Sequence, residues 1–359
     1  MGSAMTGPFR SAARVAKALL LIWLATLAGG GAAPAQEAPL VLKMGSAFPS
    51  KLPQLGTLGV SLAEKLDRIS AGGLTLEFHE PNELMPPQDM FGAIAAGSLD
   101  AAWSTPGYWF EREPALILFS GIPFGPTPGE YAAWIYYGGG QTLMQEIYAK
   151  RNIHAMICGI TVPEAAGWFR KEIKSVADLK GLKIRIRGLG ARVMERLGAV
   201  PQVVDPAEIY KALQNGRIDA TEYSTPAIDQ DLGFQRVARY YYFPGWHQPS
   251  TLFELMLSRK AWEALSDSRK AQLELACGDN FREGLAEGEA GQFAALNDLK
   301  AKGVELRSLP PEVLAALRAS WDAVAEEIAA GDETFRSVYT SLQAFRRDYR
   351  LWKDLGYLP

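Results

Sequence analysis

The chain has 359 residues and a net charge of −3 at pH 7, and 48% of its residues are hydrophobic. Its 37 basic and 40 acidic residues nearly balance. It therefore lacks the strongly basic surface that nucleic acid requires, and we expect no nucleic-acid partner. The length is sufficient for two ordinary domains or one large one, with a substantial core.

Residues 1–35 have the order of a secretory signal peptide. Basic residues precede the apolar run at 18–28, and Ala-Pro-Ala at 33–35 offers a small-residue cleavage site. The run is too short for a membrane span, which needs about 20 apolar residues. We therefore expect an exported, periplasmic protein that is soluble after signal cleavage.

From residue 40 the chain alternates strand-like and helix-like segments. A strand is predicted at 40–46, a helix over 55–73 and a second strand at 74–80. A helix over 86–100 continues into another strand, and the pattern recurs from about residue 154. This order predicts an α/β fold with a mixed or largely parallel sheet covered by helices.

Segment 205–226 echoes segment 86–106. Each has an acid, an aromatic residue, a glycine, an [IL]-D-A triplet and then S-T-P. The echo indicates two similar α/β lobes, and ligands in such sheets bind at the carboxyl ends of the strands. We expect the loops WSTPGYW and EYSTPAID to face a shared cleft.

The stretch GLKIRIRGLG at 181–190 places Lys183, Arg185 and Arg187 at every second position. Side chains of a strand alternate between its faces, so one face here would be cationic. The residues allow two interpretations. One is an edge strand whose charges prevent aggregation, and the other is a pocket for an anion.

Cysteines and histidines give weak signals. Cys158 and Cys277 lie in apolar contexts, so we expect two buried thiols, although an oxidising compartment also permits a disulfide. His79, His154 and His247 show no ligand spacing, and each is expected to be structural or exposed. The sequence has no G-x-S-x-G, H-E-x-x-H or P-loop motif, so no nucleophile–base set can be named.

The last part of the chain is predicted to be helical. An apolar stripe runs over about 314–328, and an aromatic-rich stripe follows Asp332, which is placed to cap the second helix. Because the second stripe is rich in aromatic residues, it must pack either on the body of the protein or on a second subunit.

The stretch 178–228, with YYYFPGWHQPS at 240–250, resembles the DctP-like solute-binding proteins of TRAP (tripartite ATP-independent periplasmic) transporters, in the branch that binds 2-oxo acids and related carboxylates. NELMPPQDMFGAIAAGSLDAAWS, GIPFGPTPGEYAAWIYYGGG and AGWFRKEIKSVADLKGLK match as well, so the resemblance runs from about Leu42 to the terminal helices.

This resemblance implies a two-lobed periplasmic binding protein fold with hinge strands, long helices and a helical C-terminus. Residues 40–158 with about 250–305 would form the first lobe, 159–249 the second, and 310–355 the terminal helices. It also implies a receptor without enzymatic activity, whose partners are a small organic acid and the TRAP membrane subunits. In this branch the terminal helix also mediates a homodimer.

The family's carboxylate-binding arginine falls on Arg185, whose planar guanidinium matches a carboxylate. Tyr108, Trp168 and Tyr223 are candidate walls of the pocket, and Arg187 is assigned to its rim.

In close relatives a cation bridges the protein and the substrate. Its ligands would fall here on Glu222, the Tyr223 carbonyl and Gln248, and Glu164 stands where the family has a glutamine near both metal and substrate. A glutamine and a glutamate have therefore changed places relative to the family, and the number of acidic residues around the cation is unchanged. An oxygen-ligand site for Na⁺ or Ca²⁺ is expected, and no organic cofactor.

The leading hypothesis is a TRAP solute-binding protein that captures a 2-oxo or 2-hydroxy monocarboxylate. Two alternatives remain open. The same family could bind a different carboxylate without metal, with Glu164 accepting hydrogen bonds from an amine or a hydroxyl. An exported metal-dependent enzyme could use Glu164 and Glu222 as acid and base.

Overall fold

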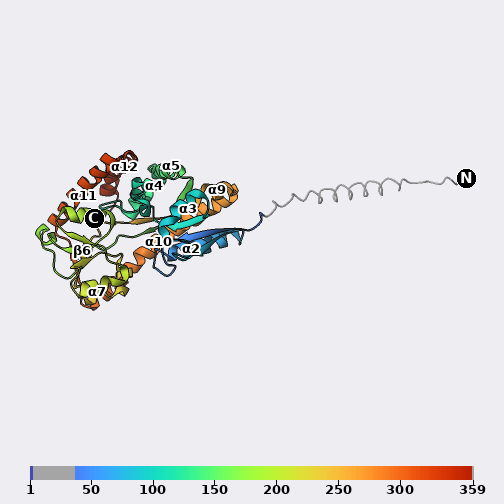
Figure 1. Cartoon of the computed structure of the whole chain (residues 1–359). Helices are drawn as coiled ribbons and strands as arrows, with labels where there is room; N and C mark the ends of the chain where they lie inside the picture. The colour runs from blue at the N-terminus through green and yellow to red at the C-terminus, as the bar shows by residue number, and fades with distance from the viewer. Residues whose placement is uncertain (3–36, 358–359) are drawn as a thin grey trace. The chain divides into compact units, whose positions relative to one another are not determined.

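The computed structural model describes residues 1–2 and 37–357, and residues 40–357 form two β-sheets with helices interleaved between the strands (Figure 1). Almost all of the predicted signal peptide lies outside the described residues. Among the helices that are described, none has the length and apolar character that crossing a membrane requires.

The first sheet has five strands in the order β2-β1-β3-β10-β4. Their bounds are β1 Leu40–Ser46, β2 Leu74–His79, β3 Ala101–Ser104, β4 Ile153–Thr161 and β10 Thr251–Ser258. β1 pairs in parallel with β2 and β3, whereas β10 runs antiparallel to β3 and β4. Every residue of β10 is buried, which shows that the sheet is covered on both faces. The prediction of a mixed sheet is confirmed.

The second sheet has six short strands in the order β11-β9-β5-β8-β6-β7. Their bounds are β5 Gly167–Phe169, β6 Lys183–Arg185, β7 Val200–Gln202, β8 Ala220–Thr221, β9 Tyr240–Phe243 and β11 Glu305–Ser308. β5 is antiparallel to both β8 and β9, whereas β6 is parallel to β7 and β8. The carboxyl ends of β6 and β8 therefore lie at the same edge of the sheet.

Helices fill the connections between strands. Those in the first half of the chain are α2 Thr57–Ser70, α3 Met90–Ala96, α4 Pro128–Tyr137 and α5 Gly140–Ala149. Those that follow are α6 Gly188–Arg196, α7 Ile209–Gln214, α8 Pro226–Asp229, α9 Arg259–Glu263, α10 Asp267–Ala301, α11 Pro311–Gly331 and α12 Glu333–Gly356. The predicted helix over 55–73 is confirmed as α2, whose Leu58, Leu62 and Leu66 form the buried stripe.

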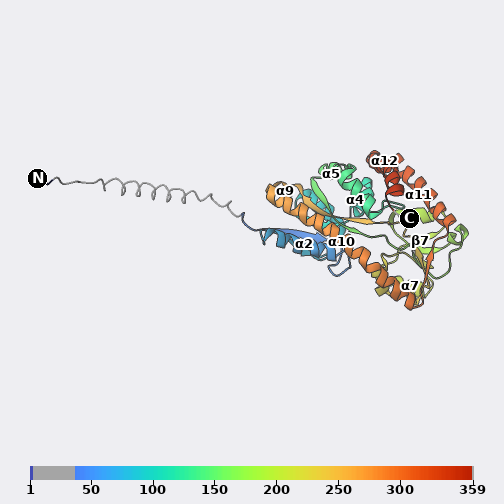
Figure 2. The ribbon, with the colours of Figure 1, turned by 180° about the vertical axis from the view of Figure 1, so that it is seen from behind.

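The 35-residue helix α10 contributes to the cores of both sheets. Near its start Leu273 and Cys277 pack with α2 and the first sheet, and near its end Leu299 packs with Trp168 and Tyr241 of the second. α10 and α2 lie side by side in both ribbon views (Figures 1 and 2). One rigid element thus spans the two sheets.

The expectation of two free thiols is wrong. Cys158 on β4 and Cys277 on α10 form a disulfide between residues 119 apart in the chain. Both cysteines are buried, as expected from their apolar surroundings. The bond joins the long helix to a strand of the first sheet.

The first half of the terminal helix α12 packs on the body of the protein. In its first half Phe335, Val338 and Leu342 are buried, and the Asp332 carboxylate caps the helix by accepting from the Phe335 amide at 2.6 Å. In its last turns Trp352 and Leu355 are 58% and 78% exposed. Packing within the chain is therefore confirmed for the first half, whereas the described residues do not cover the last turns.

Candidate functional site

Arg185 is the last residue of β6, in the interior of the second sheet. β6 pairs with β7 on one side and β8 on the other, so it is not an edge strand and that interpretation is wrong. Arg185 is only 7% exposed, whereas Lys183 and Arg187 are exposed. A buried guanidinium must have anionic or carbonyl partners, which favours the pocket interpretation.

One side of the Arg185 guanidinium is held by Glu222, which directly follows β8. Nη1 donates to the Glu222 carbonyl and to Glu222 Oε1, each at 2.8 Å. The guanidinium carbon also lies 5.6 Å from the centre of the Tyr223 ring. Nε is buried and has no hydrogen-bond partner among the described residues. The buried fork therefore keeps an unused donor.

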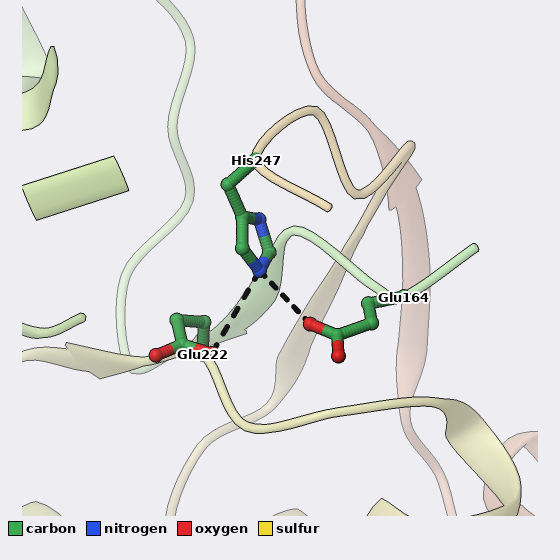
Figure 3. A group of neighbouring side chains, drawn as sticks. All are labelled: Glu164, Glu222 and His247. Carbon is green, nitrogen blue, oxygen red and sulfur yellow. Dashed lines mark hydrogen bonds and ion pairs between the residues drawn. The ribbon is translucent and has the colours of Figure 1, made fainter. Parts of the chain in front are cut away.

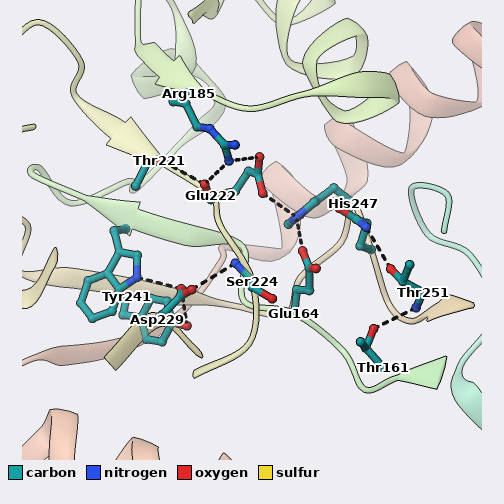
Figure 4. Close-up of polar contacts among 12 residues, drawn as sticks. Thr161, Glu164, Arg185, Thr221, Glu222, Ser224, Asp229, Tyr241, His247 and Thr251 are labelled. Atoms are coloured by element: carbon teal, nitrogen blue, oxygen red, sulfur yellow. Dashed lines mark hydrogen bonds and ion pairs between the residues drawn. The ribbon is translucent and has the colours of Figure 1, made fainter. Parts of the chain in front are cut away.

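Glu164 and His247 complete a cluster of buried polar groups with Glu222. Glu164 follows β4, and its amide donates to the Gln248 carbonyl at 3.2 Å, which ties it to the loop between β9 and β10. His247 Nε2 lies 3.1 Å from Glu164 Oε2 and 3.7 Å from Glu222 Oε2 (Figure 3). One ligand atom from each of the three residues lies within 4.8 Å of the others. The side chains form a continuous row from Arg185 through Glu222 and His247 to Glu164 (Figure 4).

Burial controls the protonation of this cluster. It raises the pKa of Glu164 to about 8, against the opposing effect of the Arg185 charge. Burial also raises the pKa of Glu222, against Arg185 and His247, and lowers the pKa of His247. Without another cation, Glu164 therefore keeps its proton near neutral pH, and Arg185 compensates Glu222.

Asp229 supports the loop that carries Glu222 and Tyr223. It is fully buried, and it accepts from Trp168 Nε1, Tyr241 OH and the Ser224 amide at 2.9, 2.9 and 3.1 Å (Figure 4). Burial raises its pKa to about 7. Trp168 itself is fully buried and stacks on Tyr241 with ring centres 4.0 Å apart. Trp168 is therefore a buried core residue whose indole holds Asp229, and its role as a wall of the pocket stays a prediction.

The other predicted residues are placed as follows. Tyr108 is 51% exposed and packs on Phe48. Burial raises the pKa of Tyr108, and the Arg187 charge opposes the rise. The Gln248 amide donates to Thr251 Oγ1 at 2.9 Å.

His247 and Asp229 were not among the predicted site residues. His247 is buried, and its ring lies between the carboxylates of Glu164 and Glu222, so of the two expectations for it, structural or exposed, the structure excludes exposure. Sequence spacing carries no signal for it, because Glu164 lies 83 residues away. The S-T-P sequence shared by the two echoing segments could have drawn attention to Asp229, the acid at the end of TPAID.

Comparisons with known proteins identify the family and the fold of this chain. Residues 44–332 match bacterial extracellular solute-binding protein, family 7. A monocarboxylate 2-oxoacid-binding periplasmic protein of Nostoc sp. is 35% identical over 299 residues, which cover 83% of this chain and 82% of the relative.

Solved structures of TRAP solute-binding proteins superpose on most of the chain. One from Colwellia psychrerythraea, with bound calcium and pyruvate, has a TM-score of 0.82 and 32% identity and covers 88% of this chain and 97% of that one. One from Bordetella bronchiseptica is a mixed-occupancy dimer with calcium and picolinate. It has a TM-score of 0.81 and 34% identity, and the match covers 88% of this chain and 94% of that one. The predicted fold class is confirmed, and this chain belongs to family 7 of the bacterial extracellular solute-binding proteins, the periplasmic receptors of TRAP transporters.

Proposed function

We propose that this chain captures a small 2-oxo or 2-hydroxy monocarboxylate in the periplasm and delivers it to TRAP membrane subunits. The observation that carries the proposal is the unused Nε donor of the buried Arg185, beside a nitrogen that already holds Glu222. A carboxylate can accept from that free side of the fork and balance the guanidinium charge. The relatives named above bind pyruvate, picolinate or 2-oxo acids.

The neighbouring side chains would shape the pocket around that carboxylate. The Tyr223 ring lies against the Arg185 guanidinium and can cover an apolar part of the ligand, and Tyr108 remains a second predicted wall. Arg187 remains at the rim. Arg185 cannot supply the affinity alone, because one charge-assisted hydrogen bond contributes about 1.5–3 kcal/mol, whereas micromolar binding needs about 8 kcal/mol.

The donor set fits a bridging cation. Glu164, Glu222 and His247 converge in a buried place, and Glu222 Oε1 accepts from Arg185 while Oε2 faces His247 Nε2 at 3.7 Å. The Tyr223 carbonyl and Gln248 remain the predicted additional ligands. A bound cation would attract the oxo or hydroxy oxygen of the substrate. Arg185 would orient Glu222 for this role, and the backbone bond from Glu164 to Gln248 would hold the two flanking segments together.

The two sheets suggest how the ligand becomes enclosed. We assign residues 40–158 with about 250–305 to the first lobe, 159–249 to the second and 310–355 to the terminal helices. β4 leads from the first sheet to Glu164, and β10 returns to it after His247. Rotation at these strand ends and along α10 would close the lobes on the ligand.

We further propose a homodimer through the last turns of α12. Leu351, Trp352, Leu355 and Tyr357 are 58–78% exposed there, and exposed apolar patches of this kind mark interaction surfaces. The Bordetella bronchiseptica relative crystallised as a dimer.

A second candidate is a different carboxylate bound without metal. It is favoured by the raised pKa of Glu164, since a protonated Glu164 can stay buried beside a bound anion and read a hydroxyl or amine. The enzyme alternative receives no such support, because the family consists of receptors.

Isothermal titration of pyruvate and lactate, with alanine as the amine-bearing control, tests the proposal. We expect pyruvate or lactate to bind in buffer that supplies Ca²⁺ or Na⁺, and more weakly after chelation in sodium-free buffer. Equal affinity in both buffers would favour the metal-free candidate. Binding of none of the acids would refute the proposal, and turnover of a bound acid to a new product would favour an enzyme.

A further inference from the structure

The terminal helix α12 is connected to the site through a turn at residues 120–126. We propose that Arg346 on α12 is a positioning residue of the binding site. It holds this turn, and the turn holds the loop between β9 and β10 that carries His247 and Gln248. The inference rests on the proposed function, because it gives Arg346 a role in the affinity for the carboxylate.

The Arg346 guanidinium binds three acceptors at once. Nη1 and Nη2 donate to the carbonyls of Phe124 and Gly125 at 2.8 and 3.2 Å, and Nε donates to Glu130 Oε1 at 2.9 Å. Glu130 belongs to α4 and is 5% exposed, so the ion pair is largely removed from water. α12 and α4 lie side by side in both ribbon views (Figures 1 and 2). The planar guanidinium therefore fixes the turn relative to both helices.

The backbone of the turn needs such contacts. Phe124 has a φ of 53°, in the left-handed region that few residues other than glycine adopt. A conformation of this kind persists only where the surrounding structure holds it. A second arginine contributes, because the guanidinium carbon of Arg318 on α11 lies 4.1 Å from the centre of the Phe124 ring. The two terminal helices thus support one strained residue from two sides.

The same turn is bonded to the loop that follows β9. The Phe124 amide donates to the Trp246 carbonyl at 2.6 Å, and the two aromatic rings lie 5.9 Å apart. Further along the loop, the buried Ser250 donates through Oγ to the Pro126 carbonyl at 3.0 Å. His247 directly follows Trp246 in the chain. A shift of the turn would therefore displace the His247 ring from the carboxylates that it faces.

A structural role and a positioning role for Arg346 predict different measurements. A contact that only stabilises the fold changes the melting temperature but leaves the affinity of the folded protein for its ligand unchanged. A contact that positions the site changes the affinity of the folded protein as well. Titration well below the melting temperature separates the two roles.

The bonds from Arg346 to the two carbonyls are best tested without the buried acid. The variant Glu130→Gln is the reference, because removing Arg346 alone would leave a buried carboxylate unpaired. We expect Glu130→Gln with Arg346→Met to bind pyruvate about tenfold more weakly than this reference, since residues of a contact network that do not touch the ligand change affinity by roughly 2- to 30-fold. The matched control is Arg347→Met. Arg347 is the next residue on α12, its side chain is 74% exposed, and its loss should leave the affinity within twofold of wild type.

Hydrogen exchange of the ligand-free protein gives an independent measurement. We expect the double variant to exchange faster than the reference at residues 122–126 and 244–248, and equally fast in α2. If the double variant does not fold, Arg346→Lys replaces it, because lysine keeps the charge beside Glu130 but cannot bond both carbonyls. Both effects are then expected in the same direction relative to wild type.

Two results would overturn the inference. One is a pyruvate affinity of the double variant within twofold of the reference, and the other is unchanged exchange at residues 244–248. Equal weakening by Arg347→Met would also contradict it, because the effect would then belong to the surface charge of α12. If wild type binds no pyruvate, the proposed function fails, whereas hydrogen exchange still shows whether Arg346 holds the loop.

Discussion

Replacing Arg185 by lysine is the sharpest test of carboxylate recognition at this site. The change keeps the positive charge but removes the planar fork. In the structure Nη1 makes two hydrogen bonds to Glu222, both 2.8 Å long, while Nε is unused. A lysine ammonium can pair with Glu222 but cannot also present a second, rigidly placed donor to the ligand.

The expected loss follows from the bonds involved. If the ligand loses one charge-assisted hydrogen bond of about 1.5–3 kcal/mol, its dissociation constant rises roughly 10- to 150-fold, since 1.4 kcal/mol is a factor of ten. The other contacts remain, so weak binding should still be measurable. A complete loss would indicate that the lysine also disturbed Glu222.

Isothermal titration with pyruvate measures the effect, and thermal unfolding without ligand shows whether the variant is folded. Arg192→Lys is the matched control, because Arg192 lies on α6 close in sequence to Arg185, with a side chain 42% exposed. We expect its affinity to stay within a factor of two of wild type. An Arg185→Lys protein that binds as tightly as wild type would refute the role of Arg185 as the clamp.

Three further predictions concern stability and assembly. Replacing Cys158 and Cys277 together by serine should lower the free energy of unfolding by about 2–5 kcal/mol, and reductant should lower the melting temperature of wild type but not of the variant. Burial raises the pKa of Glu254 from 4.5 to about 7, so its contribution to stability is present below pH 4.5 and is lost as pH rises through 7. The variant Glu254→Gln should therefore show a smaller fall in melting temperature between pH 4.5 and 7. A pH profile equal to that of wild type would contradict the raised pKa of Glu254. Trp352→Asp with Leu355→Asp should convert a dimer to a monomer in sedimentation, and a wild-type monomer at high concentration would remove the dimer altogether.

The spacing of apolar residues in the sequence predicted helices and strands well where those apolar residues are the ones that are buried. Leu58, Leu62 and Leu66 recur at helical spacing and are buried, so α2 was predictable within a few residues. In β6, alternation predicted the strand but not its place in the sheet. That place depends on pairing with β7 and β8, which are distant in sequence. Local charge therefore could not distinguish an edge strand from a buried one.

The site shows the same division. Arg185 and Glu222 end neighbouring parallel strands, so the rule that ligands bind at carboxyl ends of strands leads to them. His247 and the Cys158–Cys277 bond depend on contacts between segments that lie far apart in the chain. Those contacts follow only from the tertiary structure. The expectation of free thiols was wrong for this reason, and the contacts of His247 could not be predicted, although the residue types themselves were apparent.

The exchange of Glu164 and Gln248 relative to the family pattern gains a physical meaning in the structure. The segments are joined by the bond from the Glu164 amide to the Gln248 carbonyl, yet their side chains meet different neighbours. The Gln248 amide donates to Thr251 Oγ1, whereas the Glu164 carboxyl meets His247 Nε2. An acid at position 164 therefore shares a buried space with Glu222, and two such carboxylates require compensating positive charge. Arg185 compensates one of them, and the other needs a proton or a cation. The exchange thus keeps the number of acids but moves the second one beside the imidazole, and this determines what can occupy the space between them.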